Sequence, residues 1–188
     1  MGRWEPNARG RLEQAALELY GERGYEQTTV AEIAKRAGLT ERTFFRHFAD
    51  KREVLFGGAG ALQELFVTGV ADAPEGAPPI DAMAAALDAA AGLFVGRREF
   101  ARRRWAAIAA NADLRERELI KLASLAAALA EALRGRGVAE PAASLAAEVG
   151  IGVFRVACQR WIEDSGELDL AQLMRESLAV LKAVAAGN

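Results

Sequence analysis

Hydrophobic residues recur at the spacing of an α-helix along nearly the whole chain, and no segment alternates in the manner of a β-strand. The pattern breaks where Gly, Pro or Asp gather. The clearest break is ADAPEGAPP at residues 71–79, where three prolines and a glycine prevent a helix from continuing. The sequence therefore predicts an all-α protein.

The segment from residue 28 to residue 55 contains two short helices joined by a tight turn. Thr29 can cap the first helix through its hydroxyl, and Glu32 can hydrogen-bond back to complete a capping box. Gly38 supplies the left-handed conformation that ends this helix, and Thr40 caps the next one. This order of elements predicts a helix-turn-helix, which places its second helix in the major groove of DNA.

The second helix of this motif is expected to expose a polar, cationic and aromatic surface, because Phe44 and Phe48 lie four residues apart and face the core. Arginine can bind guanine bidentately, and threonine can contact a base through its hydroxyl or its methyl. A helix N-terminus and the basic residues that follow the helix can hold phosphates. The candidate DNA-binding residues are Thr29, Thr40, Arg42, Thr43, Phe45, Arg46, His47 and Lys51.

These elements resemble, in order and spacing, the N-terminal domain of the TetR family of bacterial transcriptional regulators. The resemblance extends from about residue 9 to residue 55 and rests on RLEQAALELYGERGY, TTVAEIAKRAG, LTERTFFRHF and ADKREVL. Family members often have a Gly and then a Tyr in the second helix, where this chain has Arg42 and Phe45. Phe45 cannot donate a hydroxyl to a phosphate, so Arg42 either replaces that contact or binds a base.

The charge of the chain favours locally placed DNA contacts over a generally basic surface. The formal net charge is −2, and residues 1–55 have 10 Lys and Arg against 9 Asp and Glu, a balance of +1. One copy with so mild a charge would bind DNA weakly at physiological salt, and a dimer would double the contacts. Any one of the cations is equally compatible with a solvated helix face.

The rest of the chain, residues 56–188, is predicted to be a helical-bundle domain for ligand sensing and dimerisation, following a DNA-binding domain at 1–55. A connecting helix is expected from about residue 50 to 70, although three glycines near its start each weaken it by about 1 kcal/mol relative to alanine. Close packing or a flexible joint would explain them, and packing is favoured. Further helices are expected near residues 80–95, 97–111, 113–135, 141–164 and 169–186, with Asp113 and Glu116 as a capping pair.

The last two predicted helices have dense apolar faces, which fit a self-complementary homodimer interface. The TetR resemblance implies that these helices form a four-helix bundle with the partner, and that the dimer binds an operator with an inverted repeat. The apolar residues are Leu145, Val149, Gly152, Val153, Val156 and Trp161 in one helix, and Leu170, Leu173, Met174, Leu178, Leu181 and Val184 in the other.

Arginines and aromatic residues gather in RREFARRRWAAIAAN at residues 97–111. This C-terminal pattern resembles a TetR subgroup with an acyl-CoA-like ligand-binding sensor, including regulators associated with mycofactocin systems. An apolar tunnel could hold an acyl chain while arginines bind phosphates; alternatively, Arg98 and Arg102 pair with Glu99 and its neighbours on a solvated face, which is favoured. The candidate ligand-binding residues are Phe94, Arg102, Trp105, Ile108 and Phe154.

Catalysis has no evident basis in this sequence, because its single histidine, His47, lies in the second helix of the motif, far from the single cysteine, Cys158. HExxH, CxxC, P-loop and GxGxxG motifs are absent, so no metal or cofactor is expected. The single cysteine excludes an internal disulfide, and the N-terminus has no apolar signal core. A cytoplasmic protein is expected.

The sequence thus favours a homodimeric repressor that a small lipophilic or acyl-CoA-like effector releases from a palindromic operator. Two other classes stay open, namely a helical small-molecule carrier without sequence-specific DNA binding and a ligand-insensitive architectural DNA-binding protein. An activator is also compatible with the sequence, which does not reveal where the operator lies relative to a promoter.

Overall fold

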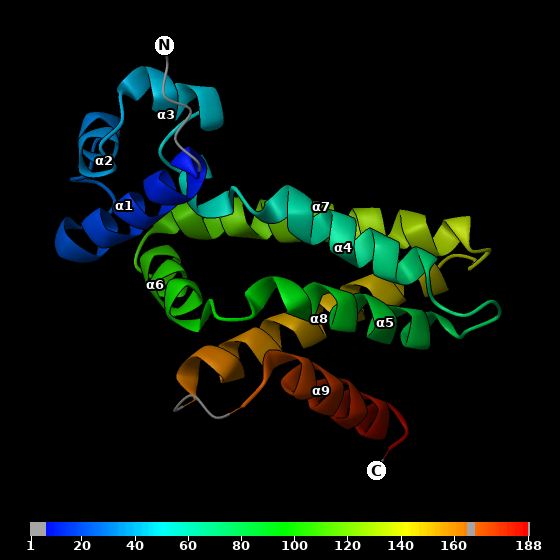
Figure 1. The fold of residues 1–188 in the computed structure, drawn as a ribbon. Helices are drawn as coiled ribbons and strands as arrows, with labels where there is room; N and C mark the ends of the chain where they lie inside the picture. The colour runs from blue at the N-terminus through cyan, green and yellow to red at the C-terminus, as the bar shows by residue number, and fades with distance from the viewer. Residues whose placement is uncertain (1–6, 165–167, 188) are drawn as a thin grey trace. The chain divides into compact units, whose positions relative to one another are not determined.

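A computed structural model describes residues 7–164 and 168–187, and all the regular elements in these two ranges are helices (Figure 1). The all-α prediction is confirmed. The chain forms two compact units, of which the first contains residues 1–59 and 100–119 and the second contains residues 60–99 and 120–188. The division expected at residue 55 had assigned 100–119 to the C-terminal domain. In the structure, Ile108 and Leu114 belong to the buried cluster of the N-terminal helices.

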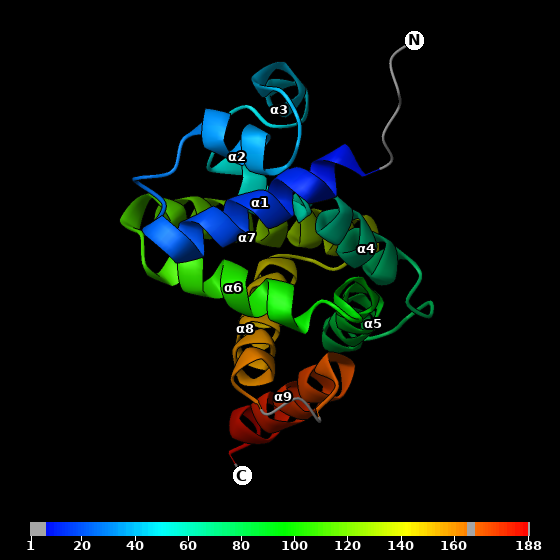
Figure 2. The same cartoon turned by 60° about the vertical axis from the view of Figure 1, so that its left-hand side comes forward.

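The first unit is built around α1 (Ala8–Arg23), which contacts both α2 (Val30–Arg36) and α3 (Glu41–His47). Figure 2 shows these three helices together. Leu12, Ile33 and Phe44, one from each helix, are fully buried in a shared hydrophobic cluster. The predicted helix-turn-helix is therefore present, and its core is formed by residues that the helical spacing places on the inner faces.

The expected connecting helix is interrupted. A short 3₁₀ helix, η1 (Glu53–Phe56), is followed by a break and then by α4 (Ala59–Ala71). At Gly57 an added Cβ would lie 2.7 Å from Arg9 Nη2 and Glu13 Oε1 and 3.0 Å from the Phe48 ring, so a larger residue there would require these side chains to shift. Nothing lies within 4 Å of a Cβ added at Gly58 or Gly60, and packing therefore does not explain those two.

The second unit contains α4, α5 (Pro79–Ala91), the 3₁₀ helix η2 (Gly92–Phe94), most of α7 (Ala112–Gly135), α8 (Ala142–Glu163) and α9 (Leu170–Ala185). Helix α8 packs against α5 and α9, and α5 also contacts α9 (Figure 1). Helix α6 (Arg98–Ala109) begins in the second unit and continues in the first. The expected helices are thus present with ends shifted by a few residues.

The start of α7 differs from the capping pair that the sequence suggested. Asn111, not Asp113, caps the helix, because its Oδ1 accepts a hydrogen bond of 3.1 Å from the amide of Leu114. Its Nδ2 also donates to Glu26 Oε1 at 2.8 Å, which ties the cap to the loop after α1. Asp113 lies within the first turn, where its negative charge interacts favourably with the helix dipole, but it does not cap the helix.

Helix α8 is apolar on two faces. Buried residues such as Val153, Phe154 and Trp161 line one face, while Leu145 and Val156 are 62% and 53% exposed on another. Segments Glu53–Ala71 and Ala142–Glu163 are long and apolar enough to cross a membrane on length and composition alone. Helix α9 repeats the pattern of α8, with Leu173 and Met174 buried and Val180 and Val184 exposed.

Candidate nucleic-acid interface

The first helix of the motif is fixed by the predicted capping box. The hydroxyl of Thr29 accepts from the amide of Glu32 at 3.2 Å, and the amide of Thr29 donates to Glu32 Oε2 at 3.0 Å. The hydrogen bonds from Thr29 lower the pKa of the Glu32 carboxyl, with a smaller contribution from Arg23. Arg23 Nη1 lies 2.6 Å from Glu32 Oε1, so α1 also holds the start of α2.

The turn between the two helices has the geometry that the sequence predicted. Gly38 has a φ of 65°, and its amide donates to Lys35 O, while the amide of Leu39 donates to Ala34 O. Thr40 then caps α3, because its hydroxyl accepts from the amide of Thr43 at 3.2 Å. The two threonine hydroxyls also lie 3.0 Å apart, so Thr40 and Thr43 support each other at the start of α3.

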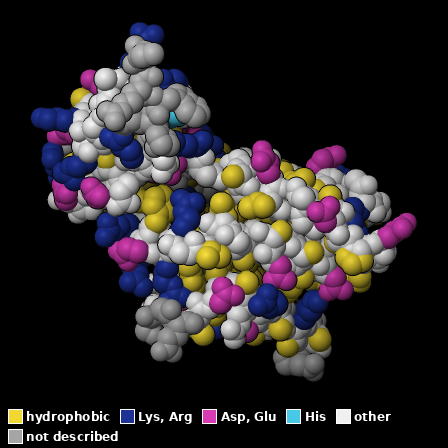
Figure 3. All heavy atoms as spheres, in the orientation of Figure 1, with side chains coloured by type: hydrophobic (Ala, Val, Ile, Leu, Met, Phe, Trp, Pro, Cys, Tyr) yellow, Lys and Arg dark blue, Asp and Glu magenta, His cyan; other side chains and the backbone are white. Residues whose placement is uncertain are grey.

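Helix α3 has a buried face and an exposed face, as the four-residue spacing of Phe44 and Phe48 predicted. Phe44 and Phe48 are buried, whereas Phe45 is 55% exposed, and Arg42 and Arg46 are also exposed. On the space-filling surface, Lys and Arg side chains lie over the N-terminal helices, with acidic side chains among them (Figure 3). The outer face of α3 is therefore cationic and aromatic, and it lies clear of the core of the first unit.

His47 is half-buried at the end of α3, and its Nε2 has no hydrogen-bond partner among the described residues. Burial lowers the pKa of its imidazole, and the charges of Arg46 and Arg9 lower it further. The lowered pKa favours the neutral imidazole, which has one donor and one acceptor nitrogen.

Unpaired cations distinguish the motif from the rest of the first unit. Across the described part of that unit, three cationic side chains have no hydrogen bond or ion pair, and they are Lys35, Arg42 and Arg46. The other cations of the N-terminal helices are engaged. For example, Arg36 lies 2.8 Å from Glu22 Oε1, and Arg52 lies 2.9 Å from Asp50 Oδ2. The free positive charge thus lies on α2 and α3.

Sequence reasoning missed Lys35. This side chain is exposed in the last turn of α2, whereas the preceding Ile33 and Ala34 are buried. In a helix-turn-helix the first helix crosses the DNA backbone. The helical spacing that identified the core face could therefore have marked Lys35 as a candidate phosphate contact.

Lys51 was expected to be exposed and to contact a phosphate, but its ammonium is bonded within the first unit. Its ammonium donates to the carbonyl oxygens of Tyr25 at 3.0 Å, Thr28 at 3.1 Å and Glu26 at 3.4 Å. It also lies 4.2 Å from the centroid of the Tyr25 ring, and the hydroxyl of Tyr20 donates to the carbonyl of Lys51 at 2.7 Å. All three ammonium protons thus have acceptors in the loop between α1 and α2.

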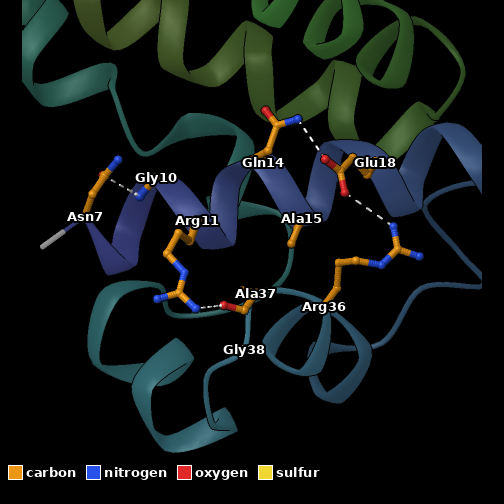
Figure 4. A pocket seen from close by; sticks show the side chains of 9 residues that line it. All are labelled: Asn7, Gly10, Arg11, Gln14, Ala15, Glu18, Arg36, Ala37 and Gly38. Atoms are coloured by element: carbon orange, nitrogen blue, oxygen red, sulfur yellow. Dashed lines mark hydrogen bonds and ion pairs between the residues drawn. The ribbon is translucent and has the colours of Figure 1, made fainter. Parts of the chain in front are cut away.

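An open groove lies beside the turn, between α1 and the end of α2 (Figure 4). Its polar side chains bond to one another or to the backbone. Arg11 donates to the carbonyl of Ala37, Gln14 Nε2 lies 2.9 Å from Glu18 Oε1, and Glu18 also pairs with Arg36. The groove therefore supports the packing of α1 on the motif and has no polar group aimed at a ligand.

The five candidate ligand-binding residues are divided between the two units. Phe94 and Phe154 belong to the second unit, where their ring centroids lie 5.9 Å apart, while Arg102, Trp105 and Ile108 belong to the first. Phe154 also contacts Phe66, and Phe94 contacts Trp161. Sequence analysis did not connect Phe66 with this cluster, and it had assigned Trp161 to the apolar face expected to form the dimer.

Arg98 takes part in the same aromatic cluster, not in the helical pair with Glu99 that was favoured. Its guanidinium lies 5.1 Å from the centroid of the Trp161 ring, and its Nη1 lies 3.2 Å from Asp164 Oδ2. The side chains of Arg98 and Asp164 are 18% and 21% exposed, so this pair is partly shielded from solvent. A cation thus covers one end of the row formed by Phe66, Phe154, Phe94 and Trp161.

Known families match both parts of the chain. Residues 13–56 match the family described as bacterial regulatory proteins, tetR family, and this range contains all the candidate DNA-binding residues. Residues 77–186, more than half of the chain, match the MftR C-terminal domain. The HTH-type transcriptional regulator TcmR of Streptomyces glaucescens is 43% identical over 84 residues, which span 45% of this chain and 37% of that protein.

Solved structures share the fold. The chain is similar to FadR from Bacillus subtilis in complex with stearoyl-CoA, with a TM-score of 0.62 and 22% identity over 92% of this chain and 96% of that one. It is also similar to FadR from Thermus thermophilus in complex with lauroyl-CoA, with a TM-score of 0.57 and 23% identity over 92% of each chain. At such identities the likeness concerns the fold alone.

Proposed function

Because the chain belongs to the TetR family of bacterial regulatory proteins, we propose that it is a homodimeric repressor that binds a palindromic operator through α3 and leaves it when a small effector binds. The observation that supports DNA binding best is the set of unpaired cations on α2 and α3. Arg42 and Arg46 have guanidinium groups with no acidic partner among the described residues, so binding DNA does not require them to break an existing ion pair.

The contacts divide by role. Arg42, Thr43 and Arg46 on α3 face the bases, where each bidentate arginine–guanine pair contributes about 1–3 kcal/mol of discrimination. Lys35 on α2 binds a phosphate, a role that the sequence had given to Lys51. Lys51 holds the loop before α2 and therefore acts on DNA binding through the position of Thr29 and its helix.

The experiment that tests this function measures binding of the full chain to DNA from beside its own gene, by fluorescence anisotropy at two salt concentrations with random competitor DNA. Arg42→Ala and Arg46→Ala should each weaken specific binding at least about fivefold. Arg36→Ala is the matched control, since this arginine is already paired with Glu22 and Glu18. Equal binding by both α3 variants and the wild type would refute the assignment.

Dimerisation is proposed through the exposed apolar faces of α8 and α9. Leu145 and Val156 on α8 and Val180 and Val184 on α9 are each more than half exposed in one copy. Such apolar side chains on two contacting helices of the second unit form a surface that a second copy of the chain can cover by twofold symmetry.

A substitution on this surface tests the dimer. Val180→Glu should convert the protein from dimer to monomer in sedimentation measurements at micromolar concentration, because a buried carboxylate without a partner is costly. Val95→Glu is the matched control, since Val95 is 79% exposed and lies outside α8 and α9. A Val180→Glu protein that sediments like the wild type would exclude this face.

For the effector, we propose a lipophilic molecule of the acyl-CoA class. The chain resembles FadR proteins whose structures contain stearoyl-CoA and lauroyl-CoA, and the second unit has an aromatic row with Arg98 beside it. Aromatic side chains suit an acyl chain, and guanidinium groups suit phosphates. Acyl-CoAs of increasing length should release the operator in the anisotropy assay, whereas free CoA should not. Release by none of them would refute this effector class and leave DNA binding intact.

A further inference from the structure

Phe45 is a large apolar side chain on the outer face of the recognition helix. It is 55% exposed, while its neighbour Phe44 is fully buried. The two rings meet edge to face, with centroids 5.4 Å apart and planes at 81°, and Phe44 also packs against Phe48. A buried ring therefore supports Phe45 from beneath and limits the directions in which it can point.

Its neighbours place Phe45 among the groups that are proposed to contact bases. Arg42 lies one turn before it and Arg46 directly after it, and both have guanidinium groups without partners among the described residues. The side chain of Phe45 has no polar atom, so it cannot donate a hydrogen bond to a phosphate or to a base edge. In the major groove the 5-methyl group of thymine is the apolar feature that the bases present.

We propose that Phe45 contacts the 5-methyl group of a thymine in each operator half-site and so selects thymine at that position. The inference rests on the proposed function, since it requires α3 to lie in the major groove. Burial of one methyl changes affinity about fourfold, and two half-sites together change it about 15-fold.

Exchange of thymine for uracil tests this proposal, because it removes the methyl and keeps every hydrogen-bonding group of the base pair. The operator is first defined by selection from a random-sequence DNA pool. Each thymine pair related by the operator symmetry is then replaced by deoxyuridine, and affinities are measured by fluorescence anisotropy. The wild type should lose about 15-fold in affinity at one symmetric pair of positions.

The variants assign that loss to a side chain. Phe45→Ala should bind the thymine and uracil operators with equal affinity, and Phe45→Tyr, which keeps the ring, should retain the preference for thymine. Circular dichroism checks that both variants keep the helical content of the wild type. A Phe45→Ala protein that still discriminates at the same position would overturn the proposal, because another residue would then contact the methyl.

The outcomes for the proposed function and for this inference are separable. If selection yields no operator and the wild-type chain shows no competitor-resistant binding, DNA recognition itself is refuted, and this inference with it. If the wild type binds a selected operator specifically but no thymine-to-uracil exchange changes its affinity, the role of Phe45 is refuted while the proposed function stands.

Discussion

Replacement of Lys51 by methionine distinguishes the structural role seen here from the phosphate contact that the sequence suggested. Methionine keeps an unbranched side chain and removes the ammonium. The carbonyls of Tyr25, Glu26 and Thr28 would then lose their shared donor. Since these residues lead into the cap of α2, the variant should destabilise the first unit and loosen the motif.

The expected magnitude follows from the three hydrogen bonds. A hydrogen bond to a charged group contributes about 1.5–3 kcal/mol when buried, and the contact with the Tyr25 ring adds about 0.5–1 kcal/mol. Lys51 is only half-buried and water can reach the freed carbonyls, so the contributions do not sum in full. A loss of about 2–3 kcal/mol in the free energy of unfolding is expected, which lowers Tm by about 5–10 °C.

Thermal and urea denaturation, followed by circular dichroism, measures the stability, and anisotropy at several salt concentrations measures the DNA contacts. Lys51→Met should lower Tm and leave the salt slope unchanged. Lys35→Met is the matched control, which should keep Tm and make the slope shallower by about 1.8 for two heads of a dimer. The opposite pattern, a stable Lys51→Met with a shallower slope, would refute the structural role and restore the phosphate contact.

Two further predictions concern packing and protonation. Gly69→Ala should lower stability by about 1–3 kcal/mol in urea denaturation, because the new Cβ would lie 2.6 Å from the backbone of α5, whereas Gly60→Ala, with no neighbour within 4 Å, should be neutral or stabilising. The two tyrosines of the chain, Tyr20 and Tyr25, both have pKa values raised chiefly by burial, that of Tyr25 to about 12. Because each folded pKa lies above the unfolded value of 10.0, the contribution of both tyrosines to stability is complete below pH 10. That of Tyr25 is lost as pH rises from 10 to about 12, and that of Tyr20 persists to higher pH. Tyrosinate absorbance should therefore appear near pH 10 in denaturant and only at higher pH in the native protein, and titration of both tyrosines near pH 10 in the native protein would contradict their burial.

The helix-turn-helix could be predicted from sequence because its determinants are local. Thr29 bonds to a residue three positions away, Thr40 does the same, and Gly38 needs only its own φ to end the helix. The buried face of α3 could be predicted because Phe44 and Phe48 lie four residues apart. Interactions between residues within one helical turn can be predicted from the spacing of residue types in the sequence.

The features that sequence reasoning missed depend on residues far apart in the chain. The acceptors of Lys51 lie 23 to 26 residues before it, and Arg98 pairs with Asp164 66 residues away. Nothing in the local pattern shows that a lysine after a helix turns back onto a loop. The choice of Asn111 over Asp113 as a cap also depended on geometry, since both residue types can cap a helix.

The division of the chain into units bears on how an effector could act on DNA binding. Residues 100–119 belong to the DNA-binding unit, where Arg104 donates to the carbonyl of Leu55 at 2.7 Å and Arg117 lies 2.6 Å from Glu53 Oε1. Three of the candidate ligand-binding residues, Arg102, Trp105 and Ile108, lie in this segment. An effector that contacts Arg102 or Trp105 would act on α6, the helix whose Arg104 is bonded to η1, and would need no relay through α4.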